Sequence, residues 1–207
     1  MKAIPVDAFC RFKFLSRVSF SPEGSNACLA VTEIDQKKDE YRSCLWLLRG
    51  GKLRKLTGSG KESSFQYLDD NTILFPGQRE EIDKESIESR FYRIALDGGE
   101  AELAWTFPIP VQKVLPLPGG DLLLVGTTFP GFEELYSGDR RLLAAYQKQL
   151  KEGKDYEEIT QVPWWWNGST FTKGSYSSLF RYSAHEEAPP PDGAQRQRVR
   201  CAALVRQ

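Results

Sequence analysis

Short apolar runs separated by turn residues dominate the chain between residues 17 and 127. Runs of this length, bounded by Gly, Pro, Asp and Asn, are typical of β-strands and not of helices. The stretch from Arg17 to Thr57 shows the pattern most clearly, because it ends in the hairpin sequence Arg49-Gly50-Gly51-Lys52. We expect four consecutive antiparallel strands there, at 18–20, 27–34, 41–48 and 53–56.

The same order of strands and turns recurs further along the chain. Turn residues in equivalent places, Gly24, Asn71 and Gly120, lie 47 and 49 residues apart. Trp46 and Tyr92, each in the third strand of its unit, lie 46 apart. A period of about 40–50 residues with four strands per repeat is the signature of a β-propeller blade. A β-sandwich with regular hairpins is the alternative, although its strands are usually less evenly spaced.

The predicted fold is therefore mainly all-β, a partial β-propeller of about three four-stranded antiparallel blades. The predicted blades cover about 17–57, 63–107 and 111–184. In the third blade we expect strands at 111–117, 122–127 and 178–182.

A long insertion interrupts the third blade, and its first part has the pattern of an amphipathic helix near 138–152. Leu142, Leu143, Tyr146 and Leu150 fall on one stripe of such a helix. Ser137 or Asp139 can cap its start, and Gly153 lies just past its end. The helix either packs this stripe on the blade or forms a lid over a central pocket.

Three adjacent tryptophans, Trp164, Trp165 and Trp166, follow the helix. They end a predicted strand at 159–166, which precedes a hairpin turn at Asn167-Gly168. These indole rings either pack on both faces of an edge strand or form an aromatic wall for a peptide or other ligand.

The two ends of the chain differ from the blades. Residues 1–16 are predicted to be an N-terminal arm. Residues 185–207 contain Pro189-Pro190-Pro191 and an Arg- and Gln-rich run, so we expect an irregular tail outside the propeller. Its abrupt change of composition suggests the hypothesis of a non-native terminus from a frameshifted or truncated gene.

Composition excludes several functions. The chain has 207 residues with 28 basic and 28 acidic side chains, so its balance of charge does not favour nucleic acid or an anionic membrane. No apolar run approaches the roughly 20 residues of a membrane-spanning helix, and residues 1–7 lack the apolar region of a secretion signal. We therefore expect a cytoplasmic protein.

Metal and nucleotide sites are also not predicted. The cysteines at 10, 28, 44 and 201 form no C-x-x-C pair. Residues 58–63 resemble a phosphate-binding loop, but Lys55 and Glu62 occupy the positions where that motif needs Gly and Ser or Thr. We expect no cofactor and no metal.

Several segments together resemble the N-terminal propeller of the prolyl oligopeptidase superfamily of serine peptidases (S9). The resemblance is stronger to the acylaminoacyl-peptidase and dipeptidyl-aminopeptidase-like branch, and it runs over about residues 15–184. The segments are Ser21-Pro22-Glu23-Gly24 before an apolar strand, Glu40–Leu47, Arg54–Thr57, Gly60–Ser64, Ile159–Pro163, Asn167–Phe171 and Ser178–Phe180.

The catalytic part of such peptidases has no counterpart in this sequence. The family places a serine in G-x-S-x-G, followed by Asp and His, in an α/β-hydrolase domain after the propeller. The chain contains no G-x-S-x-G, and its single histidine, His185, lies in the tail. A Ser-His-Asp triad needs a histidine as general base, so we predict no catalytic residue and no peptidase activity for the chain by itself.

The resemblance implies a role in selecting substrates. In this superfamily the propeller covers the active site and limits entry, and some relatives bind the free amine of the substrate through propeller glutamates. Candidate substrate-binding residues here are Glu133 and Glu134, with Trp164, Trp165 and Trp166. The predicted function is a non-catalytic, substrate-gating propeller of a peptidase whose substrate is a peptide. The alternative is a stand-alone protein- or peptide-binding module that self-associates through open blade edges.

Overall fold

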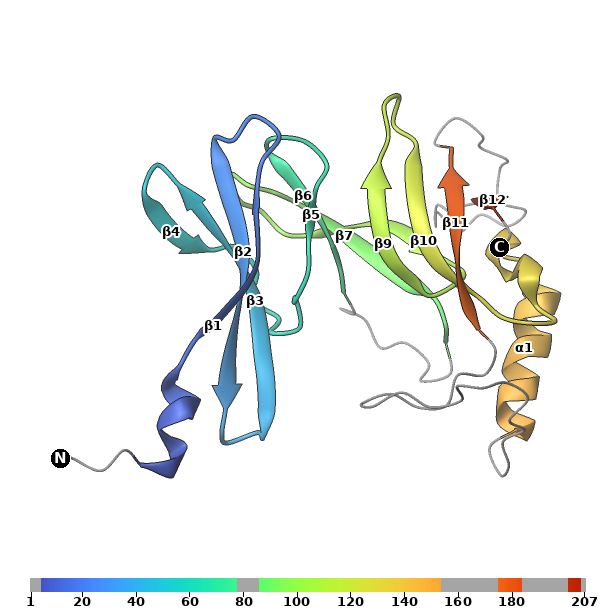
Figure 1. Cartoon of the computed structure of the whole chain (residues 1–207), viewed down its shortest axis with the longest axis horizontal. Coiled ribbons are helices and arrows are strands. Elements are labelled where there is room, and N and C mark those ends of the chain that lie inside the picture. Colours follow the sequence, from blue (N-terminus) through green and yellow to red (C-terminus); the bar gives the residue numbers. More distant parts are fainter. Residues whose placement is uncertain (1–4, 78–85, 154–174, 184–200, 206–207) are drawn as a thin grey trace. The chain divides into compact units, whose positions relative to one another are not determined.

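The computed structural model describes residues 5–77, 86–153, 175–183 and 201–205, and the account below concerns these residues (Figure 1). Contacts divide the chain into two compact units. Unit 1 is Met1–Glu81 with Arg90–Ala104, and unit 2 is Ile82–Ser89 with Trp105–Gln207. No helix in the described segments is long and apolar enough to cross a membrane.

Sheet A, in unit 1, is an antiparallel meander in the order β1-β2-β3-β4. β2 and β3 pair over ten positions, from Asn26 opposite Arg49 to Asp35 opposite Glu40. Gly50 and Gly51 have φ of 56° and 73°, which suits a two-residue hairpin of the kind that needs positive φ at both positions. The strands are β1 (Phe14–Phe20), β2 (Asn26–Asp35), β3 (Glu40–Arg49) and β4 (Lys52–Lys55).

The expected N-terminal arm is structured differently from the prediction. It contains a short 3-10 helix, η1 (Val6–Arg11), and β1 already begins at Phe14. The expected boundary at residue 16 therefore falls inside the first strand. Phe14, Leu15 and Ser16 pair with β2, and the register shifts between Ser16 and Ser19.

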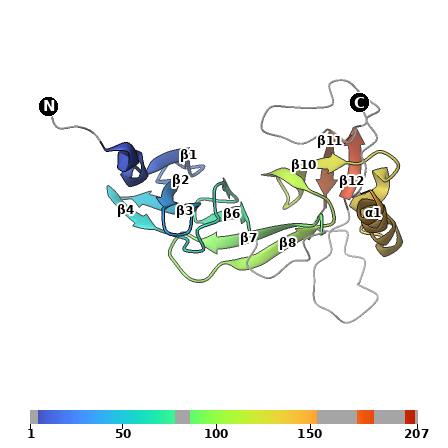
Figure 2. The ribbon, with the colours of Figure 1, turned by 90° about the horizontal axis from the view of Figure 1, so that it is seen from below.

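Sheet B has the order β5-β6-β7-β8, and β7 and β8 run side by side in Figure 2. Trp46 pairs with Leu29 in sheet A, and Tyr92 pairs with Phe75 in sheet B. The two aromatic residues therefore occupy the same place in successive blades, as their spacing predicted. The strands are β5 (Gln66–Tyr67), β6 (Thr72–Pro76), β7 (Ser89–Ala95) and β8 (Glu102–Phe107).

A shared hydrophobic core joins one face of sheet A to one face of sheet B. Sheet A contributes small and branched residues, and sheet B contributes larger ones. The buried members are Cys28, Ala30, Leu45 and Leu47 from sheet A, with Tyr67, Ile73, Phe75, Tyr92, Ile94 and Leu96 from the second blade. Burial of apolar area of this kind is the main contribution to the stability of such a pair of sheets.

Sheet C, in unit 2, has the order β12-β11-β10-β9. β11 pairs with β10 across the whole insertion, from Leu122 opposite Tyr182 to Thr128 opposite Tyr176. This confirms that the strand predicted at 178–182 belongs to the third blade. The strands are β9 (Val111–Pro116), β10 (Leu122–Thr128), β11 (Tyr176–Tyr182) and β12 (Cys201–Val205).

The structure departs from the sequence prediction at β12. This strand pairs antiparallel with β11, with Cys201 opposite Tyr182, and supplies the fourth strand of the blade. The composition of residues 185–207 predicts an irregular tail instead. The apolar run at 201–205 was the available signal, but the proline-rich segment before it concealed the return of the chain to the sheet.

The fold class is therefore as predicted: the described residues are mainly β, and they form three four-stranded antiparallel blades and one α-helix. The helix, α1 (Arg140–Glu152), lies within the predicted range.

Candidate functional site

The two predicted substrate-binding glutamates lie in a second 3-10 helix, η2 (Glu133–Ser137), just before α1. Glu133 is half-buried and Glu134 is exposed. The Glu133 carboxylate accepts a hydrogen bond from the backbone N–H of Gly131 at 3.0 Å. That contact closes the turn that leads into η2. The other predicted binding residues, Trp164, Trp165 and Trp166, lie outside the described residues.

Helix α1 begins at Asp139, whose side chain accepts a hydrogen bond from the backbone N–H of Arg141 at 2.7 Å. Of the two predicted caps, Asp139 is the one used. Tyr146 is the buried residue of the apolar stripe, and its ring lies 4.7 Å from that of Phe129 and 5.2 Å from that of Phe132. These contacts attach the stripe to the segment that connects β10 with η2.

The inserted segment also covers part of sheet C. The ring of Tyr136 lies 5.4 Å from that of Phe180, which is fully buried in β11. Leu135 of η2 is 1% exposed. The insertion thus stabilises one face of the third blade.

The buried cysteine of the first core is chemically inert. Burial raises the pKa of the Cys28 thiol, so it stays protonated at neutral pH and is a poor nucleophile. Burial likewise raises the pKa of Tyr67, which lies in the same core. In the described segments no group of three or more His, Cys, Asp or Glu side chains could hold a metal ion.

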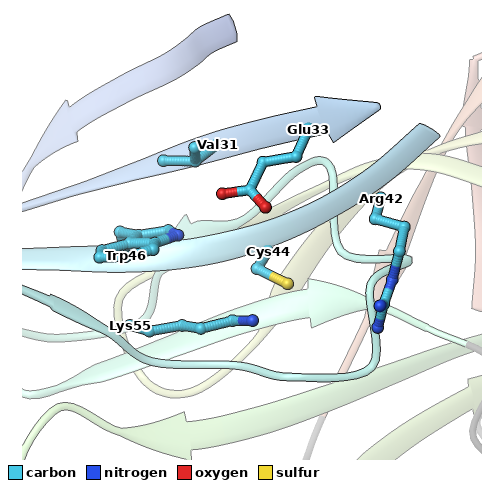
Figure 3. Close-up of a pocket in the computed structure, with 6 residues that line it drawn as sticks. All are labelled: Val31, Glu33, Arg42, Cys44, Trp46 and Lys55. Atoms are coloured by element: carbon cyan, nitrogen blue, oxygen red, sulfur yellow. The ribbon is translucent and has the colours of Figure 1, made fainter. Parts of the chain in front are cut away.

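A small cavity lies on the face of sheet A that points away from sheet B (Figure 3). Its walls come from three neighbouring strands, and they combine an apolar floor with charged side chains at the rim. The lining residues are Val31 and Glu33 of β2, Arg42, Cys44 and Trp46 of β3, and Lys55 of β4.

The charged rim is held in place by Lys13, which precedes β1. Its ammonium group lies 2.6 Å from the Glu33 carboxylate and 5.7 Å from the centre of the Trp46 ring. The hydrogen bond from Lys13 is the main cause of the lowered pKa of Glu33. The Glu33 carboxylate is therefore ionised at neutral pH and paired with a cation.

The size of the cavity limits what it can bind. It encloses about 60 Å³, which is room for about two water molecules. Pockets for small-molecule ligands are typically about 300–1,000 Å³. The cavity therefore suits the tip of one side chain and not a peptide or a metabolite.

Sequence reasoning predicted the strands that form this cavity but not the cavity itself. The signal was the alternation in β2 and β3, where Val31 and Glu33 lie on one face and pair with Cys44 and Arg42. Recognising the site requires knowing which face of the sheet is covered by sheet B, and the strand pattern alone does not give that.

The comparisons with known proteins point to peptidases. No family model matches the chain. By sequence, the chain is 23% identical over 182 residues to the uncharacterized peptidase YuxL of Bacillus subtilis (strain 168), and the match covers 86% of this chain and 26% of that protein.

Among the solved structures that the fold resembles are acylaminoacyl peptidases. One, in complex with Z-Gly-Gly-Phe-chloromethyl ketone, has a TM-score of 0.59 at 14% identity, covering 84% of this chain and 24% of the peptidase. Another, from Pyrococcus horikoshii, has a TM-score of 0.60 at 13% identity, covering 88% and 25%. The chain thus spans about a quarter of the length of the relatives it matches. The resemblance to peptidases that was predicted from the residues is confirmed.

Proposed function

We propose that this chain is the substrate-gating propeller portion of a cytoplasmic serine peptidase of the prolyl oligopeptidase superfamily, and that it is catalytically inactive by itself. The observation that carries the proposal is the match of most of the chain to peptidases by both sequence and fold. The three four-stranded antiparallel sheets are of the kind from which a propeller is built.

In this proposal the substrate is a peptide, and its free amine is held by Glu133 and Glu134. A carboxylate near an ammonium group forms a charge-assisted hydrogen bond, which supports this assignment. Trp164, Trp165 and Trp166 supply an aromatic surface for the peptide side chains. Loss of peptide binding in the double variant E133Q/E134Q, measured by calorimetry, tests the assignment; unchanged binding would contradict it.

The test of inactivity is an assay of the purified chain with aminoacyl and acylaminoacyl chromogenic substrates. We expect no turnover, because the sequence lacks G-x-S-x-G and its single histidine lies in the tail. A parallel sample treated with a serine-modifying inhibitor is the control. Turnover that the inhibitor abolishes would refute the proposal.

A second candidate function is a stand-alone protein- or peptide-binding module that acts as an oligomer. The observation that favours it is the exposure of large apolar side chains along the first blade, among them Leu15 at 65% and Phe20 at 67%. Apolar surface that gathers in one place marks interaction sites on soluble proteins.

A further inference from the structure

The cavity on sheet A lies where the pairing of β3 with the chain that follows it is interrupted. β4 pairs with β3 as far as Lys55, which lies opposite Trp46. The chain then leaves β3 and returns at Gly60, whose carbonyl accepts a hydrogen bond from the backbone N–H of Ser43 at 2.8 Å. The gap lies beside Cys44, which lines the cavity (Figure 3). Bulges and similar interruptions of strand pairing are common next to active sites.

The loop that spans this gap is the glycine-rich segment 58–63, which resembles a phosphate-binding loop but lacks the full motif. Gly60 has φ of 86°, and a Cβ atom added there would lie 2.8 Å from Nε of Arg42. The lack of a side chain at this position lets the Arg42 guanidinium group pack directly against the loop. This contact restricts the guanidinium group beside the cavity, which Arg42 lines.

Two cationic side chains line the cavity from neighbouring strands, Arg42 of β3 and Lys55 of β4. In Figure 3 their ends lie on either side of the Cys44 sulfur. Within the part of the chain that the structure describes, Lys55 forms no ion pair. Arg42 has a long one, with 3.9 Å between Nη1 and the Asp35 carboxylate. Both cations can therefore donate hydrogen bonds to an anion in the cavity.

The acidic side chain in the cavity wall, Glu33, does not neutralise these cations. Its carboxylate lies 2.6 Å from the Lys13 ammonium group. Lys55 and Arg42 also lower the pKa of Glu33, but they do so less than the hydrogen bond from Lys13 does. Lys13 and Glu33 thus balance each other, and Asp35 balances Arg42 at most. The charge that remains at the cavity is positive.

We propose that Arg42 and Lys55 form a binding site for a small carboxylate anion in this cavity. A guanidinium group can donate two parallel hydrogen bonds to a carboxylate, and an ammonium group can donate another. The cavity encloses about 60 Å³, which is room for about two water molecules, and the two oxygens of a carboxylate need a similar space. Val31 and Trp46 supply apolar surface for the carbon atoms. The site does not depend on the peptidase proposal.

An NMR titration that follows the indole N–H of Trp46 tests the proposal, with sodium acetate replacing sodium chloride at constant ionic strength. We expect a shift that saturates, because the cavity holds one anion. Lys55→Gln should weaken acetate binding about tenfold or more, because it removes a charged hydrogen-bond donor. Sulfate should bind more weakly than acetate, because its four oxygens need more space than the cavity offers.

Lys52→Gln is the matched control, since Lys52 also lies on β4 and is exposed, as Lys55 is, but does not line the cavity. The amide spectrum of each variant shows whether it is folded. A shift that never saturates would overturn the proposal, as would unchanged acetate binding in Lys55→Gln. Equal weakening in the two variants would indicate general attraction of anions to a basic strand and would also overturn it. Sulfate binding as tight as that of acetate would overturn the assignment to a carboxylate.

Discussion

Arg49, the last residue of β3, links the two sheets of the first unit through its guanidinium group. It donates to the Asn26 side-chain oxygen at 2.5 Å and to the Asn71 side-chain oxygen at 3.0 Å, and it forms an ion pair with Asp97. Asn71 in turn donates to Asp97 at 2.7 Å. One side chain thus holds the turns at the ends of two successive blades, where the apolar core stops.

The carboxylate of Asp97 makes this link sensitive to acid. Hydrogen bonds from Arg49 and Asn71 lower its pKa below the ordinary value of 3.8. The unfolded chain therefore binds a proton at higher pH than the folded one, so the stabilisation is complete above the ordinary pKa. We expect it to disappear as the pH falls from the ordinary value through the lowered one.

Urea unfolding of the wild type and of Asp97→Asn across the acid range checks this prediction. The free energy of unfolding of the two proteins should differ at neutral pH, and the difference should shrink in acid. The variant Asp69→Asn, in the neighbouring turn, is a comparison for general effects of removing a carboxylate. A difference that stays constant with pH would contradict the prediction.

The inserted element, α1, is stabilised at its start and in its middle by different contacts. The Asp139 side chain accepts from the Arg141 N–H in the first turn, where helix N–H groups otherwise lack partners. Tyr146 attaches the middle of the helix to Phe129 and Phe132. A helix of 13 residues is marginal in isolation, so we expect both contacts to be needed.

Replacing Asp139 by Ala should destabilise α1 by about 1 kcal/mol, because the first turn loses its cap. Hydrogen exchange of the amides in α1 measures the effect, and exchange should become faster there than in β10 and β11. Asp139→Asn keeps a capping oxygen and should leave exchange nearly unchanged. Equal exchange in the Ala and Asn variants would show that the cap does not stabilise the helix.

At the scale of the whole molecule, the chain is divided into two units, and the core that joins sheets A and B belongs to the first. Leu45 is a fully buried member of that core. Separate cores allow parts of a protein to open with different free energies. The stability of sheets A and B should therefore respond to Leu45 more strongly than that of sheet C.

Leu45→Ala should cost about 2–5 kcal/mol, because it leaves a cavity in a close-packed core. Hydrogen exchange should show a loss of protection in β2, β3, β6 and β7, with a smaller loss in β10 and β11. Leu103→Ala, at a side chain that is 42% exposed, is the control and should change little. A uniform loss of protection in all three sheets would mean that the units unfold as one.

Much of the fold followed from local signals. The pair Gly50-Gly51 predicted the hairpin between β3 and β4, and the 46-residue spacing of Trp46 and Tyr92 predicted the repeat. Asp139 and Gly153 predicted where the helix begins and where it ends. Each signal depends on residues close together in sequence or on the regular recurrence of a pattern, and both can be read from the sequence without knowing the tertiary contacts.

The sequence by itself therefore determined the strands, the hairpins, the blade repeat and the inserted helix, because turn conformation and hydrophobic periodicity are properties of neighbouring residues. Only the tertiary structure decided that residues 201–205 complete the third blade, that Arg49 reaches Asp97, and that sheet B covers one face of sheet A while Leu48 and Leu53 stay exposed on the other. These contacts join residues far apart in the chain. Alternation shows that a strand has two faces, but which face becomes buried depends on the element that packs against it.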